Sequence, residues 1–415
     1  MKLPSGWEIK RIEEVADVKG GKRLPKGHSL VEENTGFPYI RVTDMKNGTV
    51  DKNGILYIPA NIAPQISRYT ISKDDVFISV AGNGLGIVGI IPESLDGANL
   101  TENADKLTKL KINQRFLFEV LRSPIIQSKV EAEKTQNAQP KLALTRIKNF
   151  QIPVPPPQEQ KKIAQILSTW DKAITTTEQL LTNSQQQKKA LMQQLLTGKK
   201  RLLDENGVRF SEEWEDHFLT DIAKIIVSPV DKKSIEGEIP VELCNYTDVY
   251  YNTRITRSIK FMNATAKESE IERYTLQVDD VVITKDSETP GDIAVPAVVT
   301  EDLQGVVCGY HLAIVRPNQK HLSGLYLNYL FSMPKTRYYF FTLATGATRF
   351  GLSVGGINKA HFRLPPLNEQ KRIAKALSAS DQEIATLKYQ IDALKQEKKA
   401  LMQQLLTGKR RVKLD

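Results

Sequence analysis

Cysteine, histidine and long apolar runs are all scarce in this sequence of 415 residues. The two cysteines, Cys244 and Cys308, lie far apart and outside any CxxC pair, which argues against a disulfide scaffold or a zinc site. We therefore expect two buried thiols. The five histidines never fall at metal-ligand spacing, so we predict no metal site. No uncharged apolar run approaches the roughly 18 residues that span a bilayer, so we expect no membrane segment.

The amino-terminal stretch, MKLPSGWEIKRIEEVADV, also lacks the features of a secretory signal. It has neither a long apolar core nor a small-residue cleavage site, and we expect the protein to stay in the cytoplasm. Lysine and arginine exceed aspartate and glutamate, which gives a formal net charge of +10. This balance favours an anionic partner, with nucleic acid as the leading candidate. The length predicts two or more domains.

One phrase, KKALMQQLLTGK, occurs at 188–199 and again at 398–409. The likeness extends upstream, where PPPQEQKKIAQIL from Pro155 matches PPLNEQKRIAKAL from Pro365. A weaker likeness continues toward the amino terminus of each copy, for example DDVFIS against DDVVIT. The chain is therefore predicted to contain two copies of one unit, each with a variable block followed by a nearly fixed block.

The fixed blocks have an apolar residue at alternating steps of four and three, the seam of a coiled coil. Pro-Pro precedes each block, and Gly198 or Gly408 follows it, so both helix ends are marked. Residues 159–196 would form a helix of roughly 57 Å. We expect the two helices to pair with each other; two separate core helices are the alternative. The apolar seam residues are Ile163, Leu167, Ile174, Leu181, Leu191, Leu195, Ile373, Leu377, Ile384, Leu387, Ile391, Leu394, Leu401 and Leu405.

The variable blocks combine short β-rich runs with helical patches. Runs such as FPYIRV, DDVFISV and AVPAVV lie between turn residues, and each set is followed by a helical patch, QRFLFEVLRSPIIQSKVE or HLSGLYLNYLFSMPKTRYYF. Each block is long enough for its own core. We therefore expect two globular α+β domains joined by two long helices.

No catalytic constellation is found in the chain. VAGNGLGIVG at 80–89 has the glycine spacing of a nucleotide loop, but no helical pattern follows it and the second copy lacks the glycines, so we interpret it as a turn. Val154 and Leu364 precede the proline pairs, where an amino-methyltransferase would have Asn or Asp. Glu159 and Glu369 lie in the first helical turn, where acids favour the helix dipole.

Two divergent blocks, each followed by a near-identical helix that opens with Pro-Pro-x-x-Glu-Gln, resemble the specificity (S) subunit of a type I restriction–modification system. GWEIKRIEEVADV and EWEDHFLTDIA, at the starts of the two variable blocks, carry the same resemblance. It implies that each variable block is a target recognition domain reading half of a split sequence in double-stranded DNA. The fixed helices would pair antiparallel as a spacer and dock two modification (methyltransferase) subunits. The chain itself would catalyse nothing, and S-adenosylmethionine, ATP and Mg²⁺ would belong to the modification and restriction subunits.

The expected fold is thus α+β, with two mixed α/β target recognition domains, two long antiparallel coiled-coil helices and a pseudo-twofold repeat. A free-standing bipartite DNA-binding regulator is the alternative function, and an undetected enzyme is a weaker one. The predicted segments are recognition domain 1 at 1–156, spacer helix 1 at 157–200, recognition domain 2 at 201–366 and spacer helix 2 at 367–415.

Long hydrogen-bond donors in turn segments are the candidate DNA contacts, because Lys and Arg bind phosphates while Arg, Asn, Gln and Lys read bases. A solvated charged turn is the alternative interpretation for each of them. One group lies in KGGKRLPKGH, a second follows the DDVFIS and DDVVIT strands, and a third lies in turns before the long helices. The candidates are Lys19, Lys22, Arg23, Lys26, Arg41, Asn83, Lys141, Lys285 and Arg349.

Overall fold

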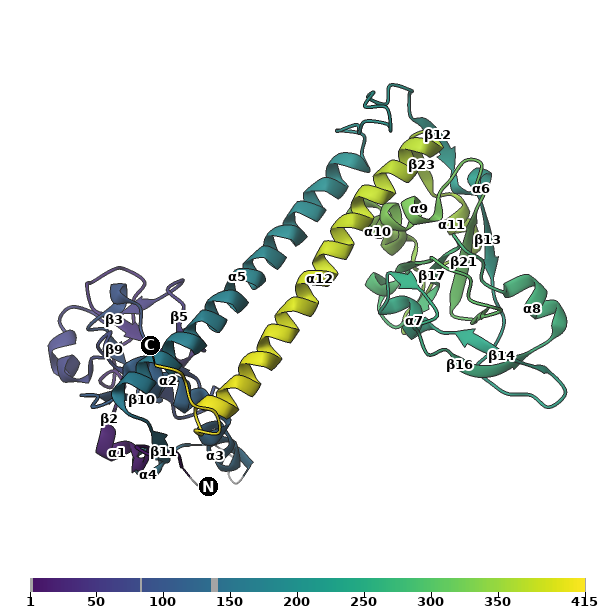
Figure 1. Ribbon diagram of the computed structural model, residues 1–415. Helices are drawn as coiled ribbons and strands as arrows, with labels where there is room; N and C mark the ends of the chain where they lie inside the picture. Colours follow the sequence, from purple (N-terminus) through teal and green to yellow (C-terminus); the bar gives the residue numbers. More distant parts are fainter. Residues whose placement is uncertain (1–2, 83, 136–140, 415) are drawn as a thin grey trace. The chain divides into compact units, whose positions relative to one another are not determined.

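The computed structural model describes residues 3–82, 84–135 and 141–414 (Figure 1). The chain divides into two compact units, residues 1–179 with 389–415 (unit 1) and residues 180–388 (unit 2). Each unit combines one variable block with part of both long helices. No helix in the described part of the chain is long and apolar enough to cross a membrane.

Unit 1 is built on an antiparallel sheet with the strand order β2-β10-β7-β8, beside a smaller sheet with the order β6-β3-β9. Its strands are β1 (Glu8–Arg11), β2 (Asp17–Gly20), β3 (Pro38–Ile40), β4 (Met45–Lys46), β5 (Thr49–Val50), β6 (Leu56–Tyr57), β7 (Val76–Ser79), β8 (Val88–Gly89), β9 (Asn99–Leu100), β10 (Ala104–Thr108) and β11 (Gln151–Val154). Its short helices are α1 (Ile12–Val15), η1 (Val42–Asp44), η2 (Ala63–Tyr69), η3 (Glu93–Leu95), α2 (Gln114–Arg122), α3 (Pro124–Thr135) and α4 (Leu144–Asn149).

Unit 2 repeats this plan with a five-stranded sheet, β13-β21-β17-β19-β15, and a smaller one, β16-β14-β20. Its strands are β12 (Glu215–Phe218), β13 (Ala223–Val227), β14 (Ile239–Cys244), β15 (Arg254–Ile255), β16 (Met262–Ala266), β17 (Val281–Thr284), β18 (Asp286–Ser287), β19 (Pro296–Val299), β20 (Val307–Cys308), β21 (Leu312–Pro317), β22 (Phe350–Gly351) and β23 (His361–Leu364). Its short helices are α6 (Leu219–Ile222), α7 (Tyr246–Tyr250), α8 (Glu268–Tyr274), η4 (Pro290–Asp292), α9 (Gly324–Phe331), α10 (Pro334–Leu343) and α11 (Val354–Asn358).

Each helical patch of the variable blocks is divided into two helices by a proline. Pro124 begins α3 and Pro334 begins α10, while the residue before each proline has an extended backbone, with ψ of 160° at Ser123 and 138° at Met333. Proline disfavours helical geometry in the preceding residue, so one continuous helix is not possible here. The two cysteines are adjacent on the parallel strands β14 and β20 and are fully buried, which confirms the expected buried thiols.

The long helices are α5 (Pro157–Leu195) and α12 (Leu367–Leu405), each of 39 residues. Gly198 and Gly408 follow them with φ of +70° and +72°, the left-handed conformation that a glycine cap provides. Within each unit the two helices run antiparallel. In unit 1, Asp171 pairs with Lys398 and Glu178 with Lys395. In unit 2, an ion pair joins Lys188 of α5 to Asp381 of α12.

The ends of the long helices belong to the cores of the globular parts. In unit 1, Ile163 and Leu167 at the start of α5 share a cluster with Phe116, and Leu405 at the end of α12 joins them. Figure 1 shows this end of α12 beside α2. In unit 2 the matching residues Ile373 and Leu377 of α12 cluster with Leu195 of α5, among other residues. All the seam residues are buried or half-buried. Near the domains the helices therefore serve as core helices as well as pairing with each other.

The Pro-Pro-x-x-Glu-Gln motif anchors each helix start to three other segments. Glu159 is 1% exposed, accepts a hydrogen bond from the Trp7 indole and pairs with Arg411, which follows α12. Gln160 accepts from the backbone N–H of Asn113 at 2.8 Å, just before α2.

The second copy repeats the arginine and glutamine contacts, whereas the indole N–H of Trp214, the counterpart of Trp7, has no hydrogen-bond partner in the residues that the structure describes. Glu369 accepts two hydrogen bonds from the Arg201 guanidinium, at 2.5 and 2.6 Å, and Gln370 accepts one from the backbone N–H of Ser323 at 3.1 Å. The sequence places these carboxylates as acids that favour the helix dipole. The structure adds that each of them pairs with an arginine of the segment that follows the other long helix.

A buried ionic cluster fixes the end of α12 in unit 1. Lys398 is 3% exposed, binds the carboxylate of Asp171 and lies 3.4 Å from Oε2 of Glu119 on α2. The contacts of Glu119 to Lys398 and Arg122 are long, 3.4–3.5 Å, so burial dominates and raises the pKa of Glu119 to about 7. Lys398 lies at the four-three spacing between the seam residues Leu394 and Leu401, and its ion pairs account for a charge at that position.

Glu119→Gln should stabilise unit 1 in a pH-dependent manner. The pKa of Glu119 is raised from 4.5 to about 7, so its stabilising contribution is complete below pH 4.5 and is lost as the pH rises through about 7. The substitution should therefore raise the free energy of unfolding by about 1–3 kcal/mol at pH 8 and by much less at pH 5. Urea unfolding at both pH values tests this. The same change in the free energy of unfolding at pH 5 and at pH 8 would contradict it.

Candidate nucleic-acid interface

The register of the main sheet in unit 1 brings several variable loops to one edge. Gly20, the last residue of β2, pairs with Asp105, and Ser79, the last residue of β7, pairs with Ala104, the first residue of β10. The loops after β2 and β7 and the loop before β10 therefore leave the sheet at the same end. The backbone N–H of Thr101 donates to the carbonyl of Ile40 at 3.1 Å, so the turn after β3 lies at the same end of the sheet. We call this end the unit 1 loop edge.

Unit 2 has the same arrangement. Val227 at the end of β13 pairs with Ala313, and Thr284 at the end of β17 pairs with Leu312 at the start of β21. The loops that follow β13 and β17 and the loop that precedes β21 meet at what we call the unit 2 loop edge.

The predicted group in KGGKRLPKGH lies on β2 and the following loop, at the unit 1 loop edge. The side chains of Lys19, Lys22, Arg23 and Lys26 are all exposed. Arg23 donates from Nε to Glu102 at 2.6 Å, so it is attached to the loop before β10. The basic loop after β2 is therefore held in place by the neighbouring loop before β10.

Two other predicted residues of unit 1 also lie at this edge. Lys141 is exposed and forms a β-bridge with Ala81, so the turn before α4 joins the glycine-rich loop. Arg41 donates to the Asp44 carboxylate at 2.6 and 2.9 Å and to the carbonyl of Gly54 at 3.0 Å, and it thereby holds its own turn. The predicted Asn83 lies outside the described residues.

The glycine-rich loop itself is a turn between strands, as the sequence predicted. It connects β7 to β8, which pair antiparallel, and Gly82 and Gly86 have φ of +74° and +90°. A strand follows the loop where a dinucleotide site would have a helix. Among residues 3–82, 84–135 and 141–414, no group of three metal-binding side chains occurs.

The predicted residues of unit 2, Lys285 and Arg349, come together at the unit 2 loop edge. Strand β18 pairs antiparallel with β22, so Lys285 lies opposite Leu352, and the contact shared by Lys285 and Arg349 is His311, whose carbonyl accepts from the backbone N–H of Lys285 at 2.8 Å. The Lys285 amine lies 2.7 Å from Asp286 Oδ2, and Nη2 of Arg349 lies 2.8 Å from Nε2 of His311. His311 begins the turn into β21, so three loops of this edge are joined by side-chain contacts.

Sequence analysis missed several residues that share a cleft of about 450 Å³ with Arg349. Tyr246 and Tyr250 stack at 5.5 Å, Tyr250 meets Tyr251 edge to face at 5.0 Å, and Tyr251 is 77% exposed. The position of the three tyrosines in the fold gives the signal that could have found them. Their turn follows β14, which pairs in parallel with β20, just as the turn of Arg41 follows β3, which pairs in parallel with β9. The missed residues are Lys232, Tyr246, Tyr250, Tyr251 and His311.

A family model of the type I restriction modification DNA specificity domain matches this chain twice, over residues 4–183 and 211–396. The chain belongs to this family. The MjaX type I restriction enzyme specificity subunit of Methanocaldococcus jannaschii is 26% identical, over 99% of this chain and 95% of that protein. The HsdS subunit of Thermoanaerobacter tengcongensis has a similar fold, with a TM-score of 0.52, 21% identity and 99% of each chain covered. The S subunit from M. genitalium gives a TM-score of 0.56 at 16% identity, with 98% of each chain covered.

The family assignment fits the fold described above. Both matches contain one variable block followed by much of a long helix, so the repeat found in the sequence is a repeat of the specificity domain. The two loop edges differ in sequence, whereas the long helices share 19 of 39 residues, including the whole of KKALMQQL at their carboxyl ends.

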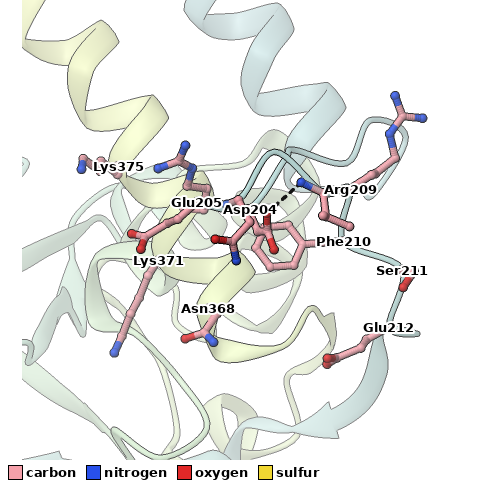
Figure 2. Close-up of a pocket in the computed structure, with 12 residues that line it drawn as sticks. Asp204, Glu205, Arg209, Phe210, Ser211, Glu212, Asn368, Lys371 and Lys375 are labelled. Atoms are coloured by element: carbon pink, nitrogen blue, oxygen red, sulfur yellow. Dashed lines mark hydrogen bonds between the residues drawn. The ribbon is translucent and has the colours of Figure 1, made fainter.

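Another cleft, of about 560 Å³, lies between the segment after α5 and the first turns of α12. Figure 2 shows Asp204 and Glu205 of this segment beside Lys371 and Lys375 of α12. Its lining has mixed charge and no residue of the unit 2 loop edge. Lys371 is exposed, as is the matching Lys161 in the first copy, so this part of the helix surface is repeated.

Proposed function

We propose that this chain is the DNA sequence-recognition subunit of a cytoplasmic type I restriction–modification complex. Each loop edge reads one half of a bipartite sequence in double-stranded DNA, and the paired helices hold the two halves of the reader at a fixed spacing. The chain carries no catalytic residues and acts only by directing its partners to the site. The observation that carries the proposal is the duplicated specificity domain, with divergent loop edges and long helices that repeat the same starting motif and the same carboxyl-terminal segment.

The repeated helices support the partners that we propose. Two identical subunits need two identical docking surfaces, and exposed residues such as Lys161 and Lys371 recur at equivalent positions of α5 and α12. We infer that two modification subunits dock on these helices and that restriction subunits, which translocate and cut DNA, join the complex. S-adenosylmethionine binds to the modification subunits, and ATP and Mg²⁺ serve the restriction subunits.

Co-expression with a modification subunit encoded beside this chain tests the proposal. The purified complex should contain two modification subunits per chain and methylate one bipartite sequence, which sequencing of modified bases in the host would identify. The chain by itself should bind DNA weakly or aggregate. A monomer that binds its site with nanomolar affinity and methylates nothing with any partner would instead support the free-standing regulator.

Replacing residues 1–155 by the matching segment of another family member should change only one half of the recognised sequence. The reason is that the loop edge of unit 1 is built from residues 17–141, apart from the loop edge of unit 2. Sequencing of modified bases gives the readout. The unchanged half and the unchanged gap serve as internal controls, and a simultaneous change of both halves would contradict this modular function.

A further inference from the structure

A chain of three side chains crosses the unit 2 loop edge, from Asp286 through His311 to Arg349. Nδ1 of His311 lies 3.4 Å from Oδ2 of Asp286, and Nε2 lies 2.8 Å from Nη2 of Arg349. Nη2 also lies 3.0 Å from Nδ1, so the guanidinium packs against the imidazole and contacts both ring nitrogens, while Asp286 contacts Nδ1. Burial lowers the pKa of His311, the contact with Asp286 raises it and the Arg349 charge lowers it, with a net lowering that favours the neutral ring beside the arginine.

The Arg349 side chain is exposed, whereas the His311 ring that it contacts is mostly buried. The His311 side chain is only 11% exposed, and the β18–β22 pairing fixes the backbone of both loops. Arg349 uses Nη2 in this contact, and among the described residues no hydrogen-bond partner lies at its Nε or Nη1. The guanidinium is thus held through Nη2, and its Nε and Nη1 donors remain without a described partner.

We propose that Arg349 reads a guanine in the half-site of unit 2 and that His311 and Asp286 are the residues that position it. The inference rests on the proposed function. Guanine presents two acceptors, O6 and N7, in the major groove, and a planar guanidinium matches them with two parallel donors. An arginine held in one orientation loses less side-chain entropy on binding than a mobile one, which favours base recognition over a loose phosphate contact.

The cleft around Arg349 has aromatic rings and a lining of mixed charge, which includes the carboxylates of Asp286, Glu288 and Asp292. The tyrosines of α7 line the same cleft, and Tyr251 is among the most exposed large side chains in the chain. Lys232 lines the cleft as well and supplies a second cation for the phosphate backbone. Aromatic faces beside a fixed arginine provide apolar contact with a neighbouring base, while the basic residues attract the DNA.

The test uses the complex co-expressed with its modification subunit and measures competition between DNA duplexes in which each base pair of the site is changed in turn. Arg349→Ala should reduce discrimination by about 10- to 100-fold at one guanine position of the unit 2 half-site. Discrimination in the unit 1 half-site should be unchanged, which also shows that the variant is folded. Arg273→Ala, an exposed arginine of α8 at the opposite end of β17, is the matched control and should change neither half-site.

His311→Ala tests the positioning role by a double-mutant cycle. It should reduce discrimination at the same base pair, by less than Arg349→Ala, and the double variant should be no worse than Arg349→Ala alone. Equal weakening at every sequence, with a smaller salt dependence, would mean a phosphate contact and would overturn the inference, as would unchanged discrimination. A wild-type complex with no bipartite preference would overturn the proposed function together with this inference.

Discussion

Replacing Lys398 by Met should lower the free energy of unfolding of unit 1 by about 3–5 kcal/mol at pH 8. Lys398 is 3% exposed and is the cation that Asp171 binds directly on the facing helix, with Glu119 3.4 Å away. Removing it leaves Arg122, 2.8 Å from Asp171 and 3.5 Å from Glu119, as the cation shared by two carboxylates. The remaining negative charge beside the buried Glu119 costs more than a single lost contact. The end of α12 should therefore separate more often from the core of unit 1.

Hydrogen exchange of the co-expressed complex measures this effect at the residues concerned. Amides of residues 389–405 and 157–179 should exchange faster in Lys398→Met than in the wild type. Lys395→Met is the matched control, because Lys395 and Glu178 form an ion pair on the same helices with both side chains about half exposed. That variant should lose less than about 1 kcal/mol. Equal acceleration in both variants would show that the buried cluster has no special role.

Inserting one heptad into each long helix, after Leu181 and after Ile391, should move the methylated site to sequences with a wider gap. Seven residues add about 10 Å of helix and keep the seam in phase. At about 3.4 Å per base pair this corresponds to roughly three more unspecified pairs. The original site should lose its methylation, and sites with the same two half-sequences should gain it, because the loop edges are unchanged.

Sequencing of modified bases in a host with the insertion variant gives the result. A useful control replaces one existing heptad of each helix by the inserted sequence, which leaves the length unchanged and should leave the site unchanged. Methylation of the original site at the original spacing by the longer variant would show that the helices do not set the gap. The repeated helix sequence would then be explained by the docking of two identical partners alone.

The sequence determined the long helices, the repeat and the class of function. The heptad seam, the proline pairs and the caps at Gly198 and Gly408 act between neighbouring residues, so their pattern is visible without a structure. The family resemblance carried by Pro-Pro-x-x-Glu-Gln was confirmed by the family match. The helical patches of the variable blocks are present as well, and each is divided into two helices at Pro124 or Pro334, because proline disfavours helical geometry in the residue before it.

Only the tertiary structure decided which distant residues meet. Glu159 pairs with Arg411 across 252 positions, and Lys398 approaches Glu119 across 279, and neither pairing leaves a local pattern. The loop edges follow the same principle, because sheet register, set by cross-strand packing, brought His311 into contact with both Lys285 and Arg349. Local periodicity encodes helices and their ends, whereas a binding surface depends on contacts between segments whose proximity exists only after the chain has folded.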